Sequence, residues 1–174
     1  AERRFGREDW RLPNRREMRS IIDHSTCLPA LPSINPFIGI NLGWYWTSTT
    51  SARNSNYAWY VHLEGGRMFY GRKTDYYWFW PVAGTSTVLP ETGETVSLEK
   101  TAPLIFRDGY AESGVRWPAP RFITRTDKVV DRLTGLTWYL EISSQDPRSW
   151  LRALAAARSL AEKTGEPWRM PNIN

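Results

Sequence analysis

Two nearly identical phrases stand near opposite ends of this chain of 174 residues. Residues 8–17 read EDWRLPNRRE, and residues 166–174 read EPWRMPNIN. The first phrase runs on into a predicted helix and several strands. The second stops where a second such helix is expected to begin. The chain is therefore expected to form the same local structure twice, each time with different neighbouring segments.

The first phrase leads into a short helix, predicted over residues 13–23. Asn14 is a favourable N-cap, and Glu17 follows three residues later, which is the spacing of a capping box. Three apolar side chains then recur at helical spacing and share one face: Met18, Ile21 and Ile22. This face predicts that the helix packs against an apolar surface.

Aromatic residues alternate along the segments that follow a predicted loop over residues 24–43. Residues 44–50 are expected to form a strand with Trp44 and Trp46 on one face. Residues 57–71 read as a hairpin, because two alternating runs flank the turn signal Gly65-Gly66. A last strand is predicted over residues 76–84, interrupted at Pro81.

The remaining chain has a different order of elements. Residues 85–114 are polar and rich in turn residues, and they are predicted to be a linker. Residues 128–140 read as two short strands around a turn at Thr134-Gly135. Residues 146–165 form the clearest helix, with Asp146 or Ser149 as its cap and Gly165 at its end. The predicted organisation is a first part over 1–84, the linker, and a second part over 115–174.

These segments together resemble one bacterial family. VRWPAPRFITRTDKVVDRLTGLTWYL, the helix after it and WRMPN look like the first half of an Lcl C-terminal domain. DWRLPNRREMRSIID, YWTSTT, AWYVHLEGG and FWPVAG look like its second half, and LPETGET resembles the stretch that often precedes such a repeat. The family is named for a collagen-like adhesin and is catalogued as a domain of unknown function.

The resemblance implies an α+β fold of the C-type-lectin-like kind, with short helices on small twisted antiparallel sheets. That fold is shared with formylglycine-generating enzymes. It also implies a chain that carries the second half of one repeat and then the first half of the next. Each half is then expected to expose an apolar face, and such faces are not left bare. The halves can close within one chain, complete those of a neighbouring chain head-to-tail, or belong to a longer repeat protein.

Residues on both faces are the predicted assembly contacts. They are Met18, Ile21 and Ile22 in the first half, and Trp150, Leu154, Leu160 and Trp168 in the second. A head-to-tail contact of this kind gives a ring or an open filament.

The charge is the second informative feature. The formal net charge is +5 and the isoelectric point is about 9.6. Seven arginines crowd the N-terminal region: Arg3, Arg4, Arg7, Arg11, Arg15, Arg16 and Arg19. Such a cluster favours an anionic partner, such as a sulfated polysaccharide or an acidic surface. The alternative is a solvated face that nearby carboxylates neutralise.

Catalytic and metal motifs are absent from the sequence. Cys27 is the single cysteine, so a disulfide framework or a catalytic cysteine pair cannot form within one chain. His24 and His62 belong to no metalloprotease or hydrolase motif. No cofactor is therefore expected, and the protein is not expected to be an enzyme. Weak calcium binding stays open through scattered carboxylates: Asp75, Asp108, Glu112 and Asp127.

Ligand binding is the favoured interpretation. Two polar loops join the aromatic strands, and the ligand-binding residues predicted in them are Arg53, Asn54, Asn56, Tyr57, Arg72, Lys73, Asp75 and Tyr76. Guanidinium and amide groups bind sugar hydroxyls and sulfates, and aromatic rings stack on pyranose rings. The expected partner is polysaccharide or another acidic surface, with head-to-tail self-association and without nucleic acid.

The location follows from the resemblance and from hydropathy. No apolar run is long enough to span a bilayer. The chain begins at Ala1 without methionine, which fits a processed or trimmed chain. The resemblance to an adhesin domain implies an extracellular or cell-surface location in a bacterium. The predicted function is adhesion, and the alternative is a structural subunit of a surface filament assembled by half-domain complementation.

Overall fold

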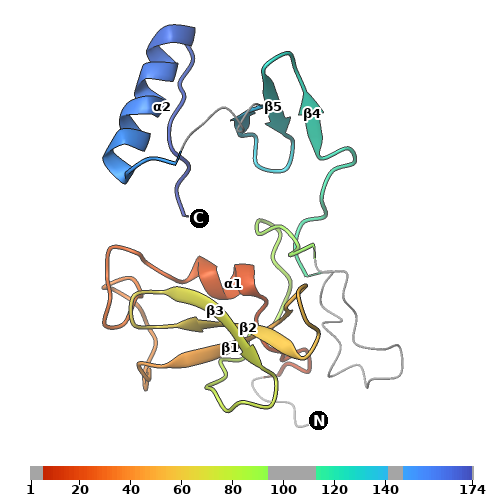
Figure 1. Ribbon diagram of the computed structural model, residues 1–174. Coiled ribbons are helices and arrows are strands. Elements are labelled where there is room, and N and C mark those ends of the chain that lie inside the picture. Colours follow the sequence, from red (N-terminus) through yellow and green to blue (C-terminus); the bar gives the residue numbers. More distant parts are fainter. Residues whose placement is uncertain (1–5, 94–112, 141–146, 174) are drawn as a thin grey trace. The chain divides into compact units, whose positions relative to one another are not determined.

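The computed structural model describes residues 6–93, 113–140 and 147–173 (Figure 1). The chain divides into two compact units, called here unit 1 (residues 1–119) and unit 2 (residues 120–174). In its described residues, each unit holds one helix and one antiparallel three-stranded sheet, in which the strand order follows the chain. These elements confirm the predicted α+β class.

Helix α1 of unit 1 spans Arg15–Ser20 and is set by its first turn. The Asn14 side chain accepts hydrogen bonds from the main-chain N–H groups of Arg16 and Glu17, both at 2.9 Å. In return the Glu17 carboxylate accepts from the Asn14 N–H at 2.8 Å. This is the predicted capping box, and it compensates for the small number of hydrogen bonds in so short a helix.

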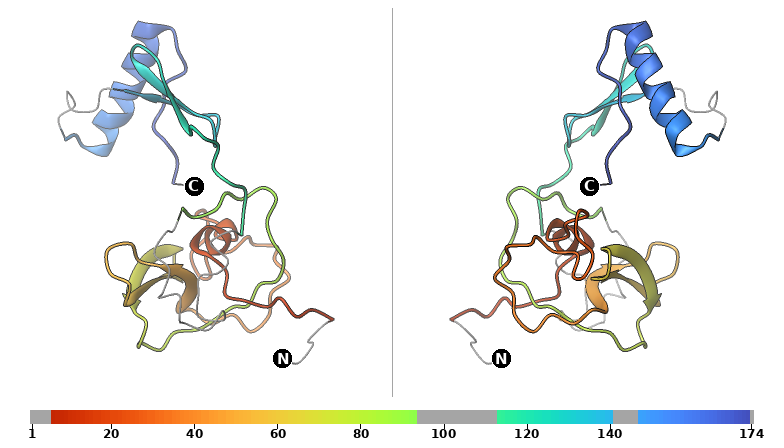
Figure 2. Two further views of the ribbon diagram at one scale, coloured as in Figure 1. Left: turned by 90° about the vertical axis from the view of Figure 1, so that its right-hand side faces the viewer. Right: turned by 90° about the vertical axis from the view of Figure 1, so that its left-hand side faces the viewer.

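The sheet of unit 1 contains β1 (Trp44–Thr50), β2 (Tyr57–His62) and β3 (Arg67–Arg72). Burial alternates along β1, as the predicted pattern requires. Gly65 and Gly66 both adopt positive φ, at 74° and 67°, and turn β2 into β3. In each view of Figure 2, α1 lies on one side of this sheet.

Residues 76–84 do not form the predicted last strand. Instead they make two isolated bridges: Trp78 pairs in parallel with Tyr45 of β1, and Val82 pairs antiparallel with Arg11. Pro81 lies between the two bridges and has no N–H to donate, so a continuous ladder cannot run through it. The prediction of a strand was wrong, although the interruption at Pro81 was placed correctly.

The core of unit 1 lies between α1, its following loop and the sheet. Its buried residues are Met18, Ile22, Ala30, Leu31, Tyr45, Val61 and Leu63. Met18 is 2% exposed, and Ile21 packs against this core from the side. The predicted bare assembly face of Met18, Ile21 and Ile22 is therefore wrong, because the unit's own sheet covers it.

Part of the predicted linker belongs to unit 1. Val115 forms a parallel bridge with Pro90, and its N–H donates to the Leu89 carbonyl at 2.9 Å. The buried Ser113 accepts a hydrogen bond from the Asn14 amide at 3.2 Å. The chain thus returns to the first turn of α1, while residues 94–112 lie outside the described part of the structure.

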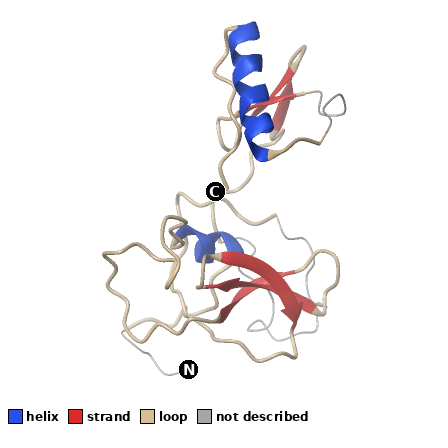
Figure 3. Ribbon diagram, turned by 60° about the vertical axis from the view of Figure 1, so that its left-hand side comes forward, coloured by secondary structure: helices blue, strands red, loops and turns tan. Residues whose placement is uncertain are grey.

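Unit 2 contains β4 (Phe122–Thr124), β5 (Lys128–Asp131), β6 (Thr137–Tyr139) and the helix α2 (Trp150–Thr164) (Figure 3). The two strands around the Thr134-Gly135 turn and the long helix were predicted. Ser149 is the N-cap, and Gly165 ends α2 in the left-handed conformation. Strand β4 was not predicted, since three residues are too few for a recognisable alternation.

A buried carboxylate organises the sheet of unit 2. Asp131 is 2% exposed and accepts hydrogen bonds from the Arg121 guanidinium at 3.0 and 2.9 Å. It also accepts from the Leu133 N–H at 3.0 Å and from the Thr134 hydroxyl at 2.9 Å. Among the described residues of this unit, Asp131 alone is buried, and no apolar side chain is.

Candidate ligand-binding site

The two predicted ligand loops meet at one end of the sheet of unit 1. Tyr57, the first residue of β2, lies opposite Arg72, the last residue of β3. One loop therefore enters β2 at the point where the other leaves β3. Residues that are distant in sequence are placed side by side by this register.

The first loop, residues 51–57, is shaped by hydrogen bonds within itself. The Ser51 N–H donates to the Tyr57 carbonyl at 2.8 Å, and the Tyr57 N–H donates to the Asn54 carbonyl at 3.0 Å. The Asn54 side chain accepts from the Asn56 N–H at 2.9 Å. The loop consequently has a defined shape, while Arg53, Asn54 and Asn56 remain exposed.

The second loop, residues 72–76, is fixed by a tight turn. The Asp75 N–H donates to the Arg72 carbonyl at 2.9 Å, and the Asp75 carboxylate accepts from the Arg72 N–H at 3.1 Å. The Lys73 N–H donates to the Asn56 carbonyl at 2.8 Å, which connects the two loops directly through the main chain. The two loops thus form one continuous surface.

Two cations on this surface are oriented by hydroxyl groups. The Arg72 guanidinium donates to the Tyr57 hydroxyl at 3.4 Å, and the Lys73 ammonium donates to the Thr50 hydroxyl at 2.9 Å. The hydrogen bond to Tyr57, followed by the charge interactions with Tyr57 and Asp75, raises the pKa of Arg72 above its usual value. Both residues are exposed, so their charges face solvent and can meet an anion.

An aromatic row continues from these loops along the face of the sheet that α1 covers. Tyr57 contacts Tyr70 at 6.0 Å between ring centroids, and Tyr70 contacts Trp59 at 5.4 Å. The guanidinium of Arg15 lies 4.0 Å above the Trp59 ring, which is a cation–π contact. Tyr70 thus packs against Tyr57, and Arg15 adds a third cation beside the sheet.

The opposite face of the sheet carries a second aromatic cluster next to the same loops. Tyr77 packs edge-on against Tyr60 at 4.9 Å and in a tilted contact with Trp46 at 4.7 Å. Burial is the main cause that raises the pKa of Tyr60, and Tyr77 adds to it. A Cβ atom at Gly71 would lie 2.7 Å from the Tyr60 ring, so a larger residue there would displace this cluster.

The structure brings all eight predicted ligand residues into these two adjoining loops. Tyr76 is 98% exposed, and Tyr57 is the one among them that is half-buried. Thr50, Tyr70 and Arg15 were not predicted as parts of the site. Tyr70 and Arg72 lie two residues apart in β3 and therefore share a face, so the sequence could have indicated Tyr70 as part of the site. No sequence pattern indicates the contact between Lys73 and Thr50.

The N-terminal arginines are largely engaged within unit 1. The Arg11 guanidinium pairs with Glu17 at 2.6 Å, and both side chains are nearly buried, at 5% and 10% exposed. Arg7 pairs with Asp9 at 2.6 Å, and its hydrogen bond is the main cause that lowers the Asp9 pKa to about 2. Neutralisation by nearby carboxylates therefore accounts for part of the cluster, while Arg3 and Arg4 lie outside the described residues.

Candidate catalytic and metal-binding residues are dispersed. Over the described ranges, no three histidine, cysteine or acidic residues gather into a group that could hold a metal ion. Asp75 is engaged in its turn, and Asp108 and Glu112 lie outside those ranges. His62 packs against Trp44 at 4.2 Å and accepts from the Glu64 N–H at 3.1 Å, which is a structural environment.

Comparison with known families identifies the part of the chain that carries this site. Residues 1–83 match the Lcl C-terminal domain. This part of the chain belongs to the Lcl C-terminal domain family. The match contains α1, the whole sheet of unit 1 and both loops of the candidate site. No curated protein and no solved structure shows significant similarity to the chain.

Membership of the Lcl C-terminal domain family indicates a surface-associated protein. None of the helices in the described residues is both long enough and apolar enough to cross a membrane. The match ends at residue 83, close to the predicted end of the first part of the chain at residue 84.

Proposed function

We propose that the Lcl C-terminal domain of this chain binds an anionic polysaccharide through the loops 51–57 and 72–76, without catalysing a reaction. The observation that carries this proposal is the main-chain hydrogen bond from Lys73 to Asn56, which holds two cationic loops in one surface. A site held in shape before binding loses less conformational entropy when the ligand binds. A polymer with a repeated anionic unit can occupy several copies of such a site at once and so gain avidity.

The proposed contacts follow from the chemistry of the side chains. Arg72 has planar donors that suit a sulfate or a carboxylate, and Lys73 contributes a compact charge beside it. Arg53 and Asn54 offer further donors from the first loop, and the exposed ring of Tyr76 offers a stacking surface for a pyranose. Charge provides most of the attraction, whereas the amide and aromatic groups select a sugar.

The test compares dextran sulfate with uncharged dextran. We expect binding to dextran sulfate that weakens as salt rises, and little binding to dextran. The double substitution Arg72→Ala and Lys73→Ala should weaken binding by about tenfold, or about 1.4 kcal/mol. The matched control removes two exposed cations elsewhere, with Arg67→Ala and Lys163→Ala, and should retain affinity within about twofold.

Two results would contradict this proposal. One is equal binding of the two dextrans, because the site would then not select charge. The other is an equal loss of affinity in both double variants, because net charge alone would then explain binding. Competition by a DNA duplex at the same salt concentration tests whether the polymer must be a polysaccharide.

A second candidate function is a surface filament, and the exposed apolar residues of unit 2 favour it. Of the predicted assembly residues, Trp150 is 68% and Leu154 is 37% exposed, and Leu160 and Trp168 are half-buried. Deleting residues 168–174, or substituting Leu154→Asp, is expected to stop assembly in sedimentation velocity. Normal assembly of both variants would overturn this candidate.

A further inference from the structure

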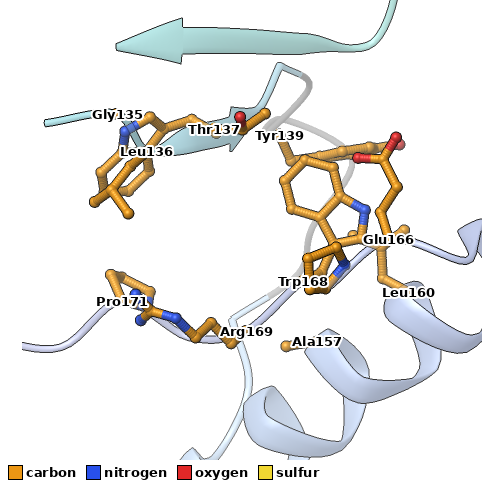
Figure 4. Close-up of a pocket in the computed structure, with 12 residues that line it drawn as sticks. Gly135, Leu136, Thr137, Tyr139, Ala157, Leu160, Glu166, Trp168, Arg169 and Pro171 are labelled. Carbon is orange, nitrogen blue, oxygen red and sulfur yellow. The ribbon is translucent and has the colours of Figure 1, made fainter. Parts of the chain in front are cut away.

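Unit 2 contains an apolar groove between β6 and α2. Its cavity volume is about 640 Å³, and Figure 4 shows side chains from the strand, the helix and the C-terminal segment around it. Most of its lining is apolar or aromatic and includes Leu136, Trp138, Tyr139, Ala157, Leu160 and Trp168, whereas Glu166 and Arg169 are the charged residues in it. An open apolar surface of this size is typical of a binding site.

One wall of the groove carries a polar atom without a partner. The indole Nε1 of Trp168 is buried and has no hydrogen-bond acceptor among the described residues. The Trp168 ring is held edge-on against Tyr139, with 5.8 Å between ring centroids. A buried donor without an acceptor is costly.

Unit 1 presents an apolar protrusion with no charge. The stretch from Ser25 to Ala52 contains no acidic or basic residue. Within it, residues 34–42, called here the apolar loop, expose Ile34 at 95% and Ile38 at 92%. Full exposure of two isoleucines on one loop is unfavourable in a monomer in water.

The apolar loop is held in shape by polar contacts at its base. The Asn35 side chain donates to the Pro32 carbonyl at 2.8 Å and accepts from the Phe37 N–H at 3.2 Å. The Tyr45 hydroxyl accepts from the Asn41 N–H at 3.0 Å, and the Phe37 ring packs edge-on against Trp80 at 4.6 Å. These contacts anchor the loop and leave Ile34 and Ile38 pointing to solvent.

We infer that the groove of unit 2 receives the apolar loop of a second copy of this chain. Ile34 and Ile38 would fill the groove. The loop brings no charged group of its own to be desolvated, and of the two charged residues that line the groove, Glu166 is already paired with Lys128. This inference rests on the second candidate function above. It assigns the contact to the apolar loop of unit 1 in place of the α1 face.

The choice of a second copy follows from the presence of both surfaces on one chain. Two different patches in contact make a heterologous interface, and each added copy leaves one free loop and one free groove. Growth is then open-ended unless the rotation between copies closes a ring.

The first experiment measures molar mass by sedimentation velocity over a concentration series. We expect association of the wild-type protein, at least tenfold weaker in Ile38→Asp and in Leu136→Asp. The matched controls introduce the same charge at exposed apolar positions outside both surfaces, with Val88→Asp in unit 1 and Leu151→Asp in α2. Both controls should associate as the wild type does.

The second experiment identifies the contact directly and does not depend on loss of assembly. In a Cys27→Ser background, one preparation carries Ile38→Cys and a second carries Leu136→Cys. Mild oxidation of the mixture should give a mixed disulfide dimer that neither preparation forms alone. Val88→Cys in place of Ile38→Cys should give none.

The outcomes separate this inference from the candidate function on which it rests. A wild-type protein that stays monomeric at every concentration overturns both. Association that survives in Ile38→Asp but not in Leu136→Asp overturns the apolar loop as the occupant and leaves the groove to another partner. Absence of the mixed disulfide in an associating protein also overturns the inference.

Discussion

The two units differ in what holds them together. Unit 1 encloses an apolar core that includes Met18, Leu31 and Leu63, each at most 2% exposed. Among the described residues of unit 2, Asp131 alone is buried, and it is bound to Arg121. A segment of this length buries little surface by itself, and removal of apolar surface from water is the main favourable term in folding. Unit 2 therefore has more to gain from a partner than unit 1 has.

The two copies of the repeated phrase show the same difference in detail. Arg11 donates to the carbonyl of the next residue, Leu12, at 3.2 Å, and Arg169 donates likewise to Met170 at 3.1 Å. Arg11 is further clamped by the Glu17 carboxylate, which α1 supplies. One local contact thus recurs in both phrases, and in the first phrase the helix that follows supplies a carboxylate as well.

The largest expected effect comes from a matched pair of leucine substitutions. Leu63 is fully buried in unit 1, so Leu63→Ala should lower the free energy of unfolding of that unit by about 3 kcal/mol. Leu154 is 37% exposed, so Leu154→Ala should lower that of unit 2 by less than about 1 kcal/mol. NMR resonances of each unit, followed through a urea titration of dilute protein, measure both values. Equal losses would contradict the difference between the units.

A somewhat smaller effect is expected when the ion pair between Arg11 and Glu17 is removed. Glu17→Gln leaves the nearly buried Arg11 guanidinium without its carboxylate, which should cost about 2–3 kcal/mol in unit 1. Glu64→Gln is the control, because its pair with Arg67 is exposed and should contribute nothing measurable. The same urea titration applies, and a similar stability of the two variants would show that the clamp is not a stabilising contact.

The smallest expected effect is a dependence of unit 2 on pH. The hydrogen bond from Arg121 is the main cause that lowers the pKa of Asp131 to about 2 from 3.8. A carboxyl with a lowered pKa stabilises the fold above its unfolded pKa, here by about 2 kcal/mol, and that contribution is lost as pH falls from about 4 to 2. Asp131→Asn should remove this dependence from the unit 2 resonances. An unchanged profile in the variant would contradict the assignment.

The sequence alone predicted the elements that depend on residues close together in the chain. They are the capping box at Asn14, the Gly65-Gly66 hairpin and the end of α2 at Gly165. The bridges of Trp78 and Val82 depend on distant partners, and the sequence pattern indicated a strand there instead. The same limit explains the apolar face of α1, since amphipathicity shows that a face is buried but not which surface buries it.

The candidate site was predictable in composition but not in geometry. Turn residues and cations between aromatic strands marked both loops. The hydrogen bond from Lys73 to Asn56 joins main-chain atoms, so no side-chain pattern encodes it. The groove of unit 2 was foreseen as an exposed face through Leu160 and Trp168, whereas its opposite wall at Leu136 and Trp138 was not.

The main-chain connection between the ligand loops bears on protein engineering. Because the Lys73–Asn56 bond uses backbone atoms, the positions that face solvent, such as Arg53, Ser55 and Tyr76, can be varied without removing it. Asn54 and Asp75 are the exceptions, since their side chains close the two turns. A library randomised at the former positions and constant at the latter would sample new ligand preferences on an unchanged scaffold.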